Sequence, residues 1–261
     1  MQWSDRVVVV TGASSGIGRA LAQHLAGRGA ALALMARRRD LLDELAAEIS
    51  AAGGKAVALP VDITDRQAVF QAFAEAQQRL GRVDVLVNNA GVGYFGPVER
   101  IAEPDLDRLV RTNVYGPIFA LQAALPALRQ SRGLVCNVSS GLSKRTLPLL
   151  APYAGTKSML DALSDGMRME LRRHGIGVVN YCAPETETDF DRTTLRGEGV
   201  SVPAMRRRRR SPERVAARIA WAIEHERREV VETRSLVWMA RVAPGLLDRM
   251  FQGMVAHYLS D

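Results

Sequence analysis

The sequence predicts an α/β fold with one doubly wound parallel sheet of about seven strands and helices on both faces. Short runs rich in Val, Leu and Ala alternate along the 261 residues with amphipathic segments of about 12 to 20 residues, as in parallel strands joined by helices. A glycine-rich turn, TGASSGIG at 11–18, joins the first apolar run to the first amphipathic segment. No Pro- or Ser-rich linker interrupts the pattern, so we expect a single domain over 1–261.

Each element has its own sequence signal. Apolar runs, many of them β-branched, predict strands at 6–12, 30–36, 55–62, 83–89, 133–140, 176–184 and 228–233. Apolar residues at helical spacing predict helices over about 16–29, 39–52, 65–80, 105–130, 152–173 and 212–226. Gly29 is expected to cap the first helix, and Ser211 followed by Pro212 marks the beginning of the last one. In such sheets ligands bind beyond the carboxyl ends of the strands.

The composition is that of an ordinary globular protein, with 47% apolar and 24% charged residues. The net charge is +7, but the five arginines of 206–210 supply most of it and leave +2 for the rest of the chain. Three explanations fit this run: a solvated loop, a docking site for an anionic substrate or acyl-carrier protein, and contact with nucleic acid or an anionic membrane. No aromatic residues interleave the run, which argues against nucleic acid.

Cysteine and histidine usage argues against a disulfide framework and a metal site. Cys136 and Cys182 are the only cysteines, and each lies in an apolar run, as buried thiols do. The four histidines have no ligand spacing, so no metal is expected. The N-terminal residues lack the features of a signal peptide, and no apolar run reaches about 18 residues. We therefore expect a cytoplasmic protein.

The glycine-rich turn suits a dinucleotide. Gly12, Gly16 and Gly18 allow a tight turn and the close approach of a pyrophosphate. The helix that begins there offers unpaired N–H groups and the positive end of its dipole. A turn whose glycines serve only packing is the alternative, but the position between the first strand and the first helix favours a dinucleotide.

The end of the second strand indicates which dinucleotide binds. Folds that use NAD place an acid there to hold the ribose hydroxyls, whereas this chain has Arg37 and Arg38, and Asp40 lies too far into the helix. An arginine favours the additional phosphate of NADP, to which Ser14 and Ser15 could add hydroxyl donors. A solvated helix start is the alternative.

Tyr153 and Lys157 lie four residues apart in a predicted helix, so they share one helix face. Reduction of a carbonyl leaves an alkoxide that needs a proton, and the proton donor works best when its pKa is near the working pH. A neighbouring ammonium is expected to lower the pKa of a phenol from its usual value near 10. The alternative is two surface side chains that happen to lie one turn apart.

Taken together, these residues resemble the short-chain dehydrogenase/reductase family over 6 to about 190, which implies a Rossmann-type fold. The matching features are the glycine turn, NNAG at 88–91 after the fourth strand, Asp62 at the end of the third strand, Asn113 within a helix, and Ser140, 13 residues before the tyrosine of YAGTK. They occur in the order in which the family has them.

The resemblance implies a role for each catalytic residue. Tyr153 would be the acid/base, Lys157 its activator and a ribose contact, and Ser140 a hydrogen-bond donor to the substrate oxygen. Asn113 would hold a water of a proton relay, or else cap an irregularity of its helix. Ser139 is the neighbouring alternative to Ser140, but adjacent strand residues point to opposite faces, and the spacing of 13 favours Ser140.

The resemblance also implies the cofactor contacts and a division of the chain. NADP(H) is expected to contact Gly12, Ser14, Ser15, Gly16, Ile17, Gly18, Arg37, Arg38, Asp62, Ile63, Asn89, Ala90, Gly91, Tyr153, Lys157, Pro184, Thr186 and Thr188. Mainly cofactor-binding residues would lie in 1–132, catalytic residues in 133–184, the substrate loop in 185–210 and an apolar helical tail in 235–261.

The segment after the strand at 176–184 departs from the family. Glu185 stands where a glycine is expected after Pro184, and glutamate resists backbone conformations that glycine allows. This loop is therefore expected to follow a different path. Thr186 and Thr188 are both candidates for the threonine that contacts the nicotinamide amide.

The C-terminal tail carries an apolar stripe at helical spacing, formed by Met239, Val242, Leu246, Met250 and Met254. The stripe would pack over the substrate pocket or against a second subunit. Shallow membrane association is the other interpretation, because Arg241 and Arg249 flank the stripe.

We therefore expect an NADP(H)-dependent oxidoreductase that interconverts a secondary alcohol and a ketone or aldehyde. The substrate would be a small hydrophobic molecule, and the assembly a homodimer or homotetramer. A nucleotide-binding regulatory or scaffold protein on the same fold, without turnover, is the alternative.

Overall fold

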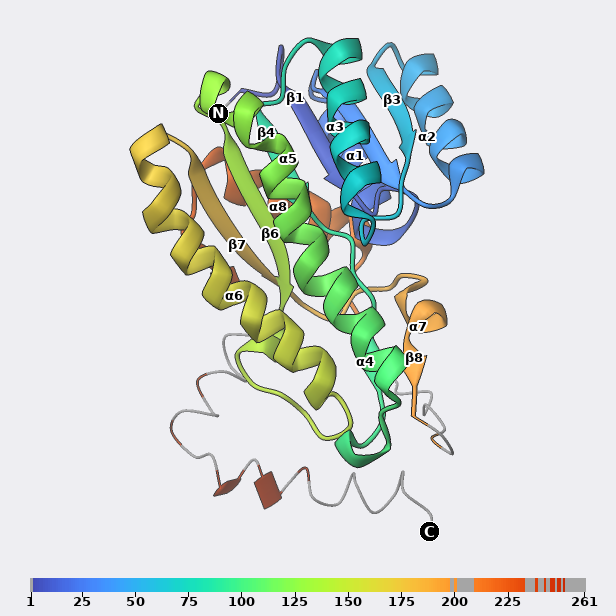
Figure 1. Ribbon diagram of the computed structural model, residues 1–261, viewed down its shortest axis with the longest axis vertical. Helices are drawn as coiled ribbons and strands as arrows, with labels where there is room; N and C mark the ends of the chain where they lie inside the picture. Colours follow the sequence, from blue (N-terminus) through green and yellow to red (C-terminus); the bar gives the residue numbers. More distant parts are fainter. Residues whose placement is uncertain are drawn as a thin grey trace.

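A seven-stranded sheet runs through the computed structural model, which describes residues 2–197, 200, 209–232, 238, 242, 245, 246, 248, 249 and 251 (Figure 1). Its strands are β1 (Val7–Thr11), β2 (Ala31–Ala36), β3 (Lys55–Pro60), β4 (Val85–Asn88), β6 (Leu134–Ser140), β7 (Gly177–Ala183) and β9 (Glu229–Val231). The strand order is β3-β2-β1-β4-β6-β7-β9, and every neighbouring pair is parallel. The doubly wound parallel sheet predicted from the sequence is confirmed.

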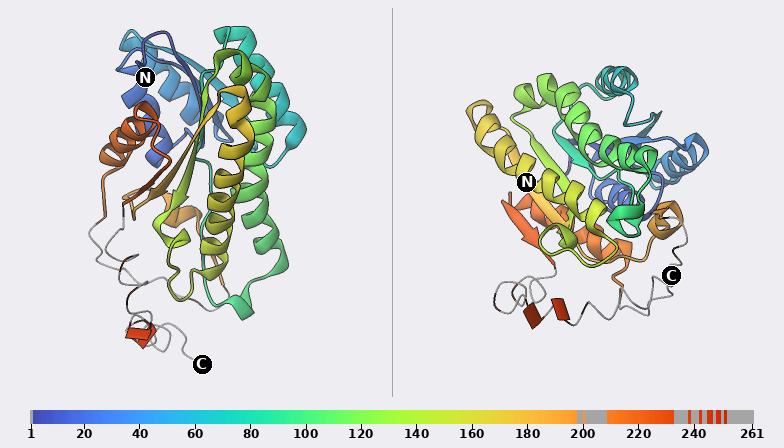
Figure 2. Two further views of the ribbon diagram at one scale, coloured as in Figure 1. Left: turned by 90° about the vertical axis from the view of Figure 1, so that its left-hand side faces the viewer. Right: turned by 60° about the horizontal axis from the view of Figure 1, so that its bottom comes forward.

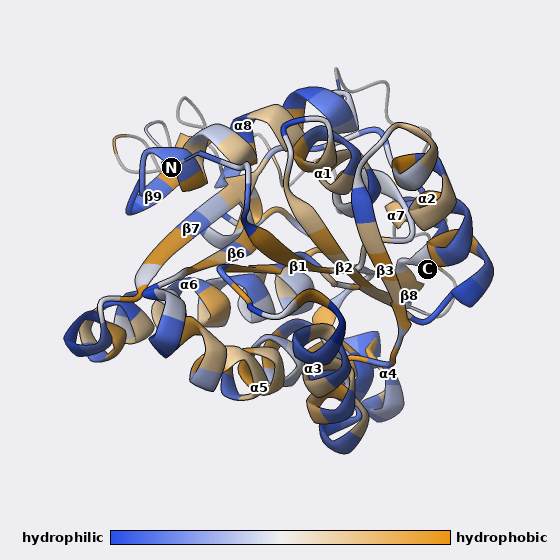
Figure 3. Cartoon of the chain, turned by 90° about the horizontal axis from the view of Figure 1, so that it is seen from above, coloured by the Kyte–Doolittle hydropathy of each residue, from blue (hydrophilic) through white to orange (hydrophobic). Residues whose placement is uncertain are grey.

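Helices cover both faces of the sheet (Figure 3). One face carries α1 (Gly16–Ala26), α2 (Arg39–Ala51) and α8 (Pro212–Glu224). The other carries α3 (Arg66–Leu80), α4 (Glu103–Val110), α5 (Gly116–Ser131) and α6 (Ala151–Leu171). Figure 2 shows α8 on the side of the sheet opposite α5 and α6. The order of the strands reverses between β1 and β4, and sheets of this kind bind ligands beyond the carboxyl ends of the strands at such a point.

Strand alternation divides the apolar core between the two faces. Val8 and Val10 of β1 pack beneath α1, α2 and α8, whereas Val7 and Val9 pack beneath α3, α5 and α6. All four side chains are at most 4% exposed. Each buried valine contributes roughly 1.5 kcal/mol or more, so a central strand with both faces covered is apolar throughout rather than alternating.

The long helix expected over 105–130 is interrupted. Between α4 and α5 lies a π-helical turn, Arg111–Tyr115, which holds Asn113. A π-turn accommodates an additional residue in a continuous helix and is frequent at functional sites. The sequence gives no periodicity change that would reveal it, because the backbone on both sides remains helical.

Gly29 does not cap α1, contrary to the prediction. The helix ends at Ala26 with Gly27 as a right-handed cap (φ −62°), and Gly29 lies beyond it with φ of +89° in the turn into β2. The short elements that were not predicted include β5 (Tyr94–Phe95), its partner β8 (Leu195–Arg196), and α7 (Phe190–Thr193). Segments of two to four residues are too short to show a hydrophobic periodicity from which they could be predicted.

Most of the apolar stripe in the tail lies outside the described residues, as do 201–208 in the substrate loop. Val242 and Leu246 are described, and each is 62% exposed. Within the part of the chain that the structure describes, no helix is both long enough and apolar enough to cross a membrane.

Candidate active site

The turn between β1 and α1 admits only glycine at several positions. Gly12 and Gly16 have φ of +68° and +54°, and a Cβ atom on Gly18 would lie 2.2 Å from the carbonyl oxygen of Gly12. Asn89 holds the turn by donating its side-chain amide to the carbonyl oxygens of Thr11 (3.0 Å) and Gly12 (3.3 Å). The first turn of α1, which is fully described, carries no acidic residue. The turn and the helix N-terminus therefore fit an anionic group such as a pyrophosphate.

Arg38 joins Ser14 and Ser15 in one cluster at the end of β2. Its Nη2 atom lies 2.8 Å from Oγ of Ser14 and 2.7 Å from Oγ of Ser15. The guanidinium donates both bonds, so each hydroxyl keeps its proton for a further acceptor. Arg37 is exposed and has no side-chain partner among the described residues, and Asp40 lies in the first turn of α2. The structure thus brings Arg38, and not Arg37, to the two serines.

The segments after β3 and β4 lie at the carboxyl edge of the sheet, as the glycine turn after β1 does. The carboxylate of Asp62 accepts hydrogen bonds from the backbone N–H (2.9 Å) and hydroxyl (2.8 Å) of Thr64. Ile63 packs against Gly116, where an added Cβ atom would lie 2.9 Å from Cγ1 of the isoleucine. The N–H of Ala90 donates to Oγ1 of Thr11 (3.1 Å). Ile17, by contrast, packs against the core beneath α1, so its side chain serves the fold.

Asn113 is fully buried in the π-helical turn. Its Oδ1 atom accepts from the N–H of Val92 (2.9 Å), and its Nδ2 atom donates to the carbonyl oxygen of Val92 (2.9 Å) and to Oγ1 of Thr156 (3.0 Å). The side chain therefore supports the helix irregularity, which was one of the two predicted roles. A Cβ atom on Gly91 would lie 3.2 Å from Oδ1 of Asn113 and 3.4 Å from Nζ of Lys157, so both groups border the space beside Gly91.

The two serines at the end of β6 point in different directions. Ser139 donates its hydroxyl to the carbonyl oxygen of Lys157 (3.2 Å), within α6. Ser140 makes a hydrogen bond with Tyr153, and its Oγ atom accepts from the N–H of Leu142 (3.2 Å). Alternation along the strand separates them in this way. Ser140 is therefore the serine beside the tyrosine.

Burial sets the pKa of both Tyr153 and Lys157. It raises the pKa of Tyr153 to about 12, an effect that the hydrogen bond with Ser140 opposes. It lowers the pKa of Lys157 to about 8, an effect that the charge of Asp161 opposes. Nζ of Lys157 donates to the carbonyl oxygen of Val138 (3.0 Å). The pKa of Tyr153 is therefore raised and not lowered as predicted, because the removal of the phenol from water outweighs the effects that favour the phenolate.

The loop after β7 passes across the glycine turn. A Cβ atom on Gly16 would lie 2.9 Å from Cγ2 of Thr188, whereas Thr186 donates its hydroxyl back to the carbonyl oxygen of Pro184 (2.9 Å). Of the two candidate threonines, the structure thus places Thr188 at the turn. Glu185 is not among the described residues with positive φ, so the loop follows a path that does not require the glycine expected there.

A charged network behind the tyrosine and lysine was not predicted from the sequence. Nζ of Lys144 lies 2.8 Å from Oδ2 of Asp161 and 2.5 Å from Oε1 of Glu229. Asn180 donates to Oδ1 of Asp161 (2.8 Å). Asp161 lies one helical turn beyond Lys157, and this spacing of four is the signal that could have revealed it.

Comparison with known proteins identifies the family. The profile of the family described as "short chain dehydrogenase" matches residues 6–199, which is most of the chain. The chain belongs to this family. Dehydrogenase/reductase SDR family member 7B from Bos taurus is 34% identical to this short-chain dehydrogenase, over 94% of its chain and 80% of the bovine protein. Gluconate 5-dehydrogenase from Gluconobacter oxydans is 38% identical, over 67% and 69% of the two chains.

Solved structures agree with this short-chain dehydrogenase in fold. An alcohol dehydrogenase from the archaeon Thermococcus sibiricus, complexed with 5-hydroxy-NADP, superposes with a TM-score of 0.76 and 29% identity, over 84% of this chain and 90% of that one. A 3-ketoacyl-(acyl-carrier-protein) reductase from Brucella melitensis, complexed with NADH, superposes with a TM-score of 0.77 and 27% identity, over 85% of this chain and 91% of that one. The family resemblance inferred from the sequence is confirmed, and with it membership of an oxidoreductase family.

Proposed function

We propose that this short-chain dehydrogenase is an NADP(H)-dependent oxidoreductase that interconverts an alcohol with the corresponding ketone or aldehyde. The observation that carries the proposal is the convergence of three groups at the end of β6. Ser140 makes a hydrogen bond with Tyr153, and Nζ of Lys157 lies next to Gly91, at the sheet edge that also holds the glycine turn. A hydroxyl donor, a proton donor and a cation at one point suit the reduction of a carbonyl.

The residues of the chain handle the oxygen and the proton of the substrate. When bound, NADP(H) supplies the hydride to the carbonyl carbon, or accepts it in the reverse direction. Ser140 donates a hydrogen bond to the carbonyl oxygen, and Tyr153 transfers its phenolic proton to the same atom as negative charge develops. Lys157 stabilises the resulting phenolate, because a pKa of about 8 keeps most of the ammonium protonated at pH 7. Both amide hydrogens of Asn113 are used within the fold, so the second lone pair of its Oδ1 atom, beside Gly91, accepts from a water that returns a proton to this pair.

Substitution of the tyrosine tests the catalytic assignment. We expect Tyr153→Phe to lower kcat by roughly 10²- to 10⁴-fold, since the proton donor is lost, while NADPH binding is retained. NADPH oxidation with a panel of ketones and aldehydes measures turnover, and fluorescence titration measures nucleotide binding. Undiminished turnover in the variant would remove Tyr153 from the mechanism. A wild-type protein that binds NADPH but reduces no member of the panel would be the regulatory protein considered as the alternative.

The choice of NADP over NAD rests on the cluster of Arg38, Ser14 and Ser15. Two hydroxyl donors and one guanidinium match the oxygens of a ribose phosphate. We expect Arg38→Gln to raise the KM for NADPH about tenfold and to leave the KM for NADH unchanged. Arg37→Gln is the matched control, because Arg37 is exposed beside the same strand end. Equal effects of the two substitutions on the KM for NADPH would contradict this cofactor assignment.

The remaining expectations complete the proposal. The substrate is a small hydrophobic carbonyl compound or alcohol, and the protein acts as a homodimer or homotetramer. Its location is the cytoplasm, where free thiols such as those of Cys136 and Cys182 remain reduced. The exposed Val242 and Leu246 in the tail suit packing against a second subunit or a membrane surface. Light scattering and co-sedimentation with lipid vesicles measure these two associations.

A further inference from the structure

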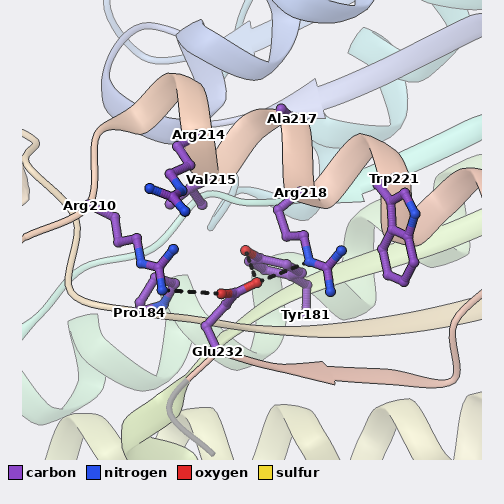
Figure 4. Close-up of a pocket in the computed structure, with 9 residues that line it drawn as sticks. All are labelled: Tyr181, Pro184, Arg210, Arg214, Val215, Ala217, Arg218, Trp221 and Glu232. Carbon is purple, nitrogen blue, oxygen red and sulfur yellow. Dashed lines mark hydrogen bonds and ion pairs between the residues drawn. The ribbon is translucent and has the colours of Figure 1, made fainter.

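A pocket lies between α8, the end of β7 and the residues after β9 (Figure 4). Its cavity volume is about 480 Å³, within the range of small-molecule sites. The side chains that matter here are those of Tyr181, Arg210, Arg214, Arg218, Trp221 and Glu232. None of the proposed catalytic residues lines it, although Pro184, one of the expected cofactor contacts, does. The pocket therefore adjoins the cofactor side without sharing the proposed reaction centre.

The pocket has more positive than negative charge. Glu232 is the one carboxylate among its lining residues, and its side chain is only 15% exposed. It lies 3.3 Å from Nε of Arg218 and 3.9 Å from Nη2 of Arg210. Arg214 has no ion pair with any residue that the structure describes. Three guanidinium groups against one carboxylate leave a net charge of about +2 on the lining residues, and arginines at i and i+4 repel each other.

Arg218 is held in place without a ligand's help. The guanidinium of Arg218 lies 3.8 Å from the centre of the Trp221 ring, and the same group donates to Glu232. The hydroxyl of Tyr181 donates to the same carboxylate (3.3 Å). Glu232 therefore orients Arg218 toward the pocket while its own charge is already paired. Such preorganisation reduces the entropy that ligand binding costs.

Arg209 precedes Arg210 in the arginine run of 206–210, and its charge is compensated by two carboxylates. Its guanidinium lies 2.7 Å from Oδ2 of Asp191 and 3.2 Å from Oε1 of Glu185, both in the segment that follows β7. Among the described residues, Arg214 has no ion pair, and Arg210 approaches only Glu232, at 3.9 Å. Of the two described arginines in the 206–210 run, only Arg209 is closely paired with carboxylates, so the excess positive charge lies on the pocket side.

We propose that this pocket binds a small molecule that carries a phosphoryl group, with Arg214 and Arg218 as its principal ligands and Arg210 as a further contact. A dianionic phosphoryl group matches the net charge and the forked geometry of the guanidinium groups, whereas a single carboxylate would leave part of the positive charge unpaired. Trp221 lines the pocket next to Arg218, whose guanidinium lies over its ring. The proposal does not depend on the reaction proposed above.

The backbone of Arg210 connects the pocket to the segment after β7 that includes Glu185 and Thr188. Its N–H donates to the carbonyl oxygen of Glu185 (3.0 Å), and its carbonyl oxygen accepts from the N–H of Glu187 (2.9 Å). Thr186 pairs with Arg210 in the resulting isolated β-bridge. A ligand that immobilises the side chain of Arg210 would thereby restrain the loop that carries Thr188 to the glycine turn.

Titration of the full-length protein with sodium pyrophosphate at constant ionic strength tests the site. Trp221 serves as a local probe, because its intrinsic fluorescence changes when Arg218 engages a ligand, and Trp221→Phe identifies its share of the signal. We expect Arg214→Gln and Arg218→Gln each to raise the Kd for pyrophosphate about tenfold. Both arginines are exposed, so neither substitution disturbs the core. Binding should weaken as ionic strength rises.

Two matched variants separate the pocket from other sites. Arg172→Gln removes an exposed arginine beyond the end of α6, and Arg38→Gln alters the nucleotide side; both should leave the Trp221 response and its midpoint unchanged. A Kd that is unchanged in Arg214→Gln, or a response that only Arg38→Gln abolishes, would overturn the proposal. A change of oligomeric mass in Arg214→Gln, without loss of pyrophosphate binding, would overturn it in favour of a subunit contact.

Discussion

Asp161 is the charged residue closest in sequence to the proposed catalytic lysine on the same helix face. It lies four residues after Lys157 in α6, and Lys144 and Asn180 hold its carboxylate at 2.8 Å each. Burial lowers the pKa of Lys157 to about 8, and the negative charge of Asp161 acts in the opposite direction, with a smaller contribution from Cys182. The carboxylate therefore keeps the lysine protonated near neutral pH.

Asp161→Asn should make the reaction more sensitive to alkaline pH. Without the carboxylate, the pKa of Lys157 falls further below 8, so the ammonium is lost at a lower pH and no longer stabilises the phenolate of Tyr153. We expect the alkaline limb of kcat/KM to move to lower pH by roughly one unit. The measurement is the pH dependence of NADPH oxidation with one carbonyl substrate.

Glu229→Gln is the matched control for that shift. It also removes a carboxylate partner of Lys144, at 2.5 Å, but Glu229 is not among the groups that shift the pKa of Lys157. Its alkaline limb should stay in place, even if the variant loses some stability. If both variants move the limb equally, the loop that Lys144 anchors is responsible, and the electrostatic role of Asp161 is wrong.

At this scale the sequence predicts positions better than energies. The spacing of Tyr153 and Lys157 is enough to place them on one helix face, because helix geometry is local. The direction of the tyrosine pKa shift was wrong, because it depends on how much water the folded chain removes from the hydroxyl. The sequence likewise does not distinguish Arg37 from Arg38 as the phosphate contact, whereas the structure places Arg38 against Ser14.

Among the elements, the turn between β1 and α1 has the least room for change. A Cβ atom on Gly18 would lie 2.2 Å from the carbonyl oxygen of Gly12 and 2.6 Å from Nδ2 of Asn89. Gly18→Ala should therefore push the turn away from β4, weaken NADPH binding and lower the free energy of unfolding by about 1–3 kcal/mol. Urea unfolding and nucleotide titration measure the two effects.

Gly166→Ala is the control for Gly18→Ala. Gly166 lies inside α6, and the closest atom to an added Cβ would be Oε1 of Glu170 at 3.9 Å, an ordinary contact. Because alanine is the better helix former, this variant should gain about 0.5–1 kcal/mol and bind NADPH as the wild type does. Equal stability changes in both variants would mean that the turn tolerates a side chain.

Regular elements were predictable, and irregular ones were not. The strands and α1 to α3 follow from period and turn residues, which depend on neighbours in sequence. The π-turn at Arg111–Tyr115 depends instead on a distant partner, the backbone of Val92, which Asn113 contacts through both ends of its amide. The pairing of β5 with β8 joins segments about one hundred residues apart and leaves no local signal.

In the whole molecule, the carboxyl edge of the sheet holds the proposed reaction centre, whereas residues at the amino edge stabilise the fold. Asp84 lies at the amino edge, remote from the glycine turn, with a side chain that is 1% exposed. It accepts from Arg6 (2.9 Å), Arg82 (2.6 Å) and the N–H of Val7 (2.9 Å). Its own backbone is bonded to β1 and to β6. This residue therefore connects three strand starts and has no contact with the proposed reaction centre.

Asp84→Asn should lower stability without changing catalysis. The charge-assisted hydrogen bonds to Arg6, Arg82 and the N–H of Val7 are weakened, and because both arginines keep contact with water the expected cost is about 1–3 kcal/mol in the free energy of unfolding. The KM values for NADPH and substrate should stay as in the wild type. Urea unfolding and steady-state kinetics below the unfolding transition measure these quantities.

A surface ion pair provides the comparison. Asp107 and Arg111 lie 2.7 Å apart with both side chains more than half exposed, so Asp107→Asn should cost under about 1 kcal/mol. If Asp84→Asn costs no more than Asp107→Asn, the amino edge does not depend on the buried carboxylate.

The overall architecture was predictable because burial on both sides leaves a direct mark on the sequence. Val7 to Val10 read as one apolar run, since each side chain enters one of two cores. The four proposed catalytic residues, Asn113, Ser140, Tyr153 and Lys157, stand out in the sequence by their order and spacing. The pocket beside α8 was not, because Tyr181, Arg218 and Glu232 come together only when β7, α8 and β9 pack.

Both thiols of the chain are shielded, and this has a practical consequence for labelling. Burial raises the pKa of Cys136 and of Cys182 to about 12, and the thiolate is the form that reacts with maleimides and iodoacetamides. A cysteine introduced on the surface, as in Met169→Cys on α6, would take up a fluorophore or spin label at pH 7 while the native thiols stay silent. Distance and mobility measurements can therefore begin from the natural chain, without first removing its cysteines.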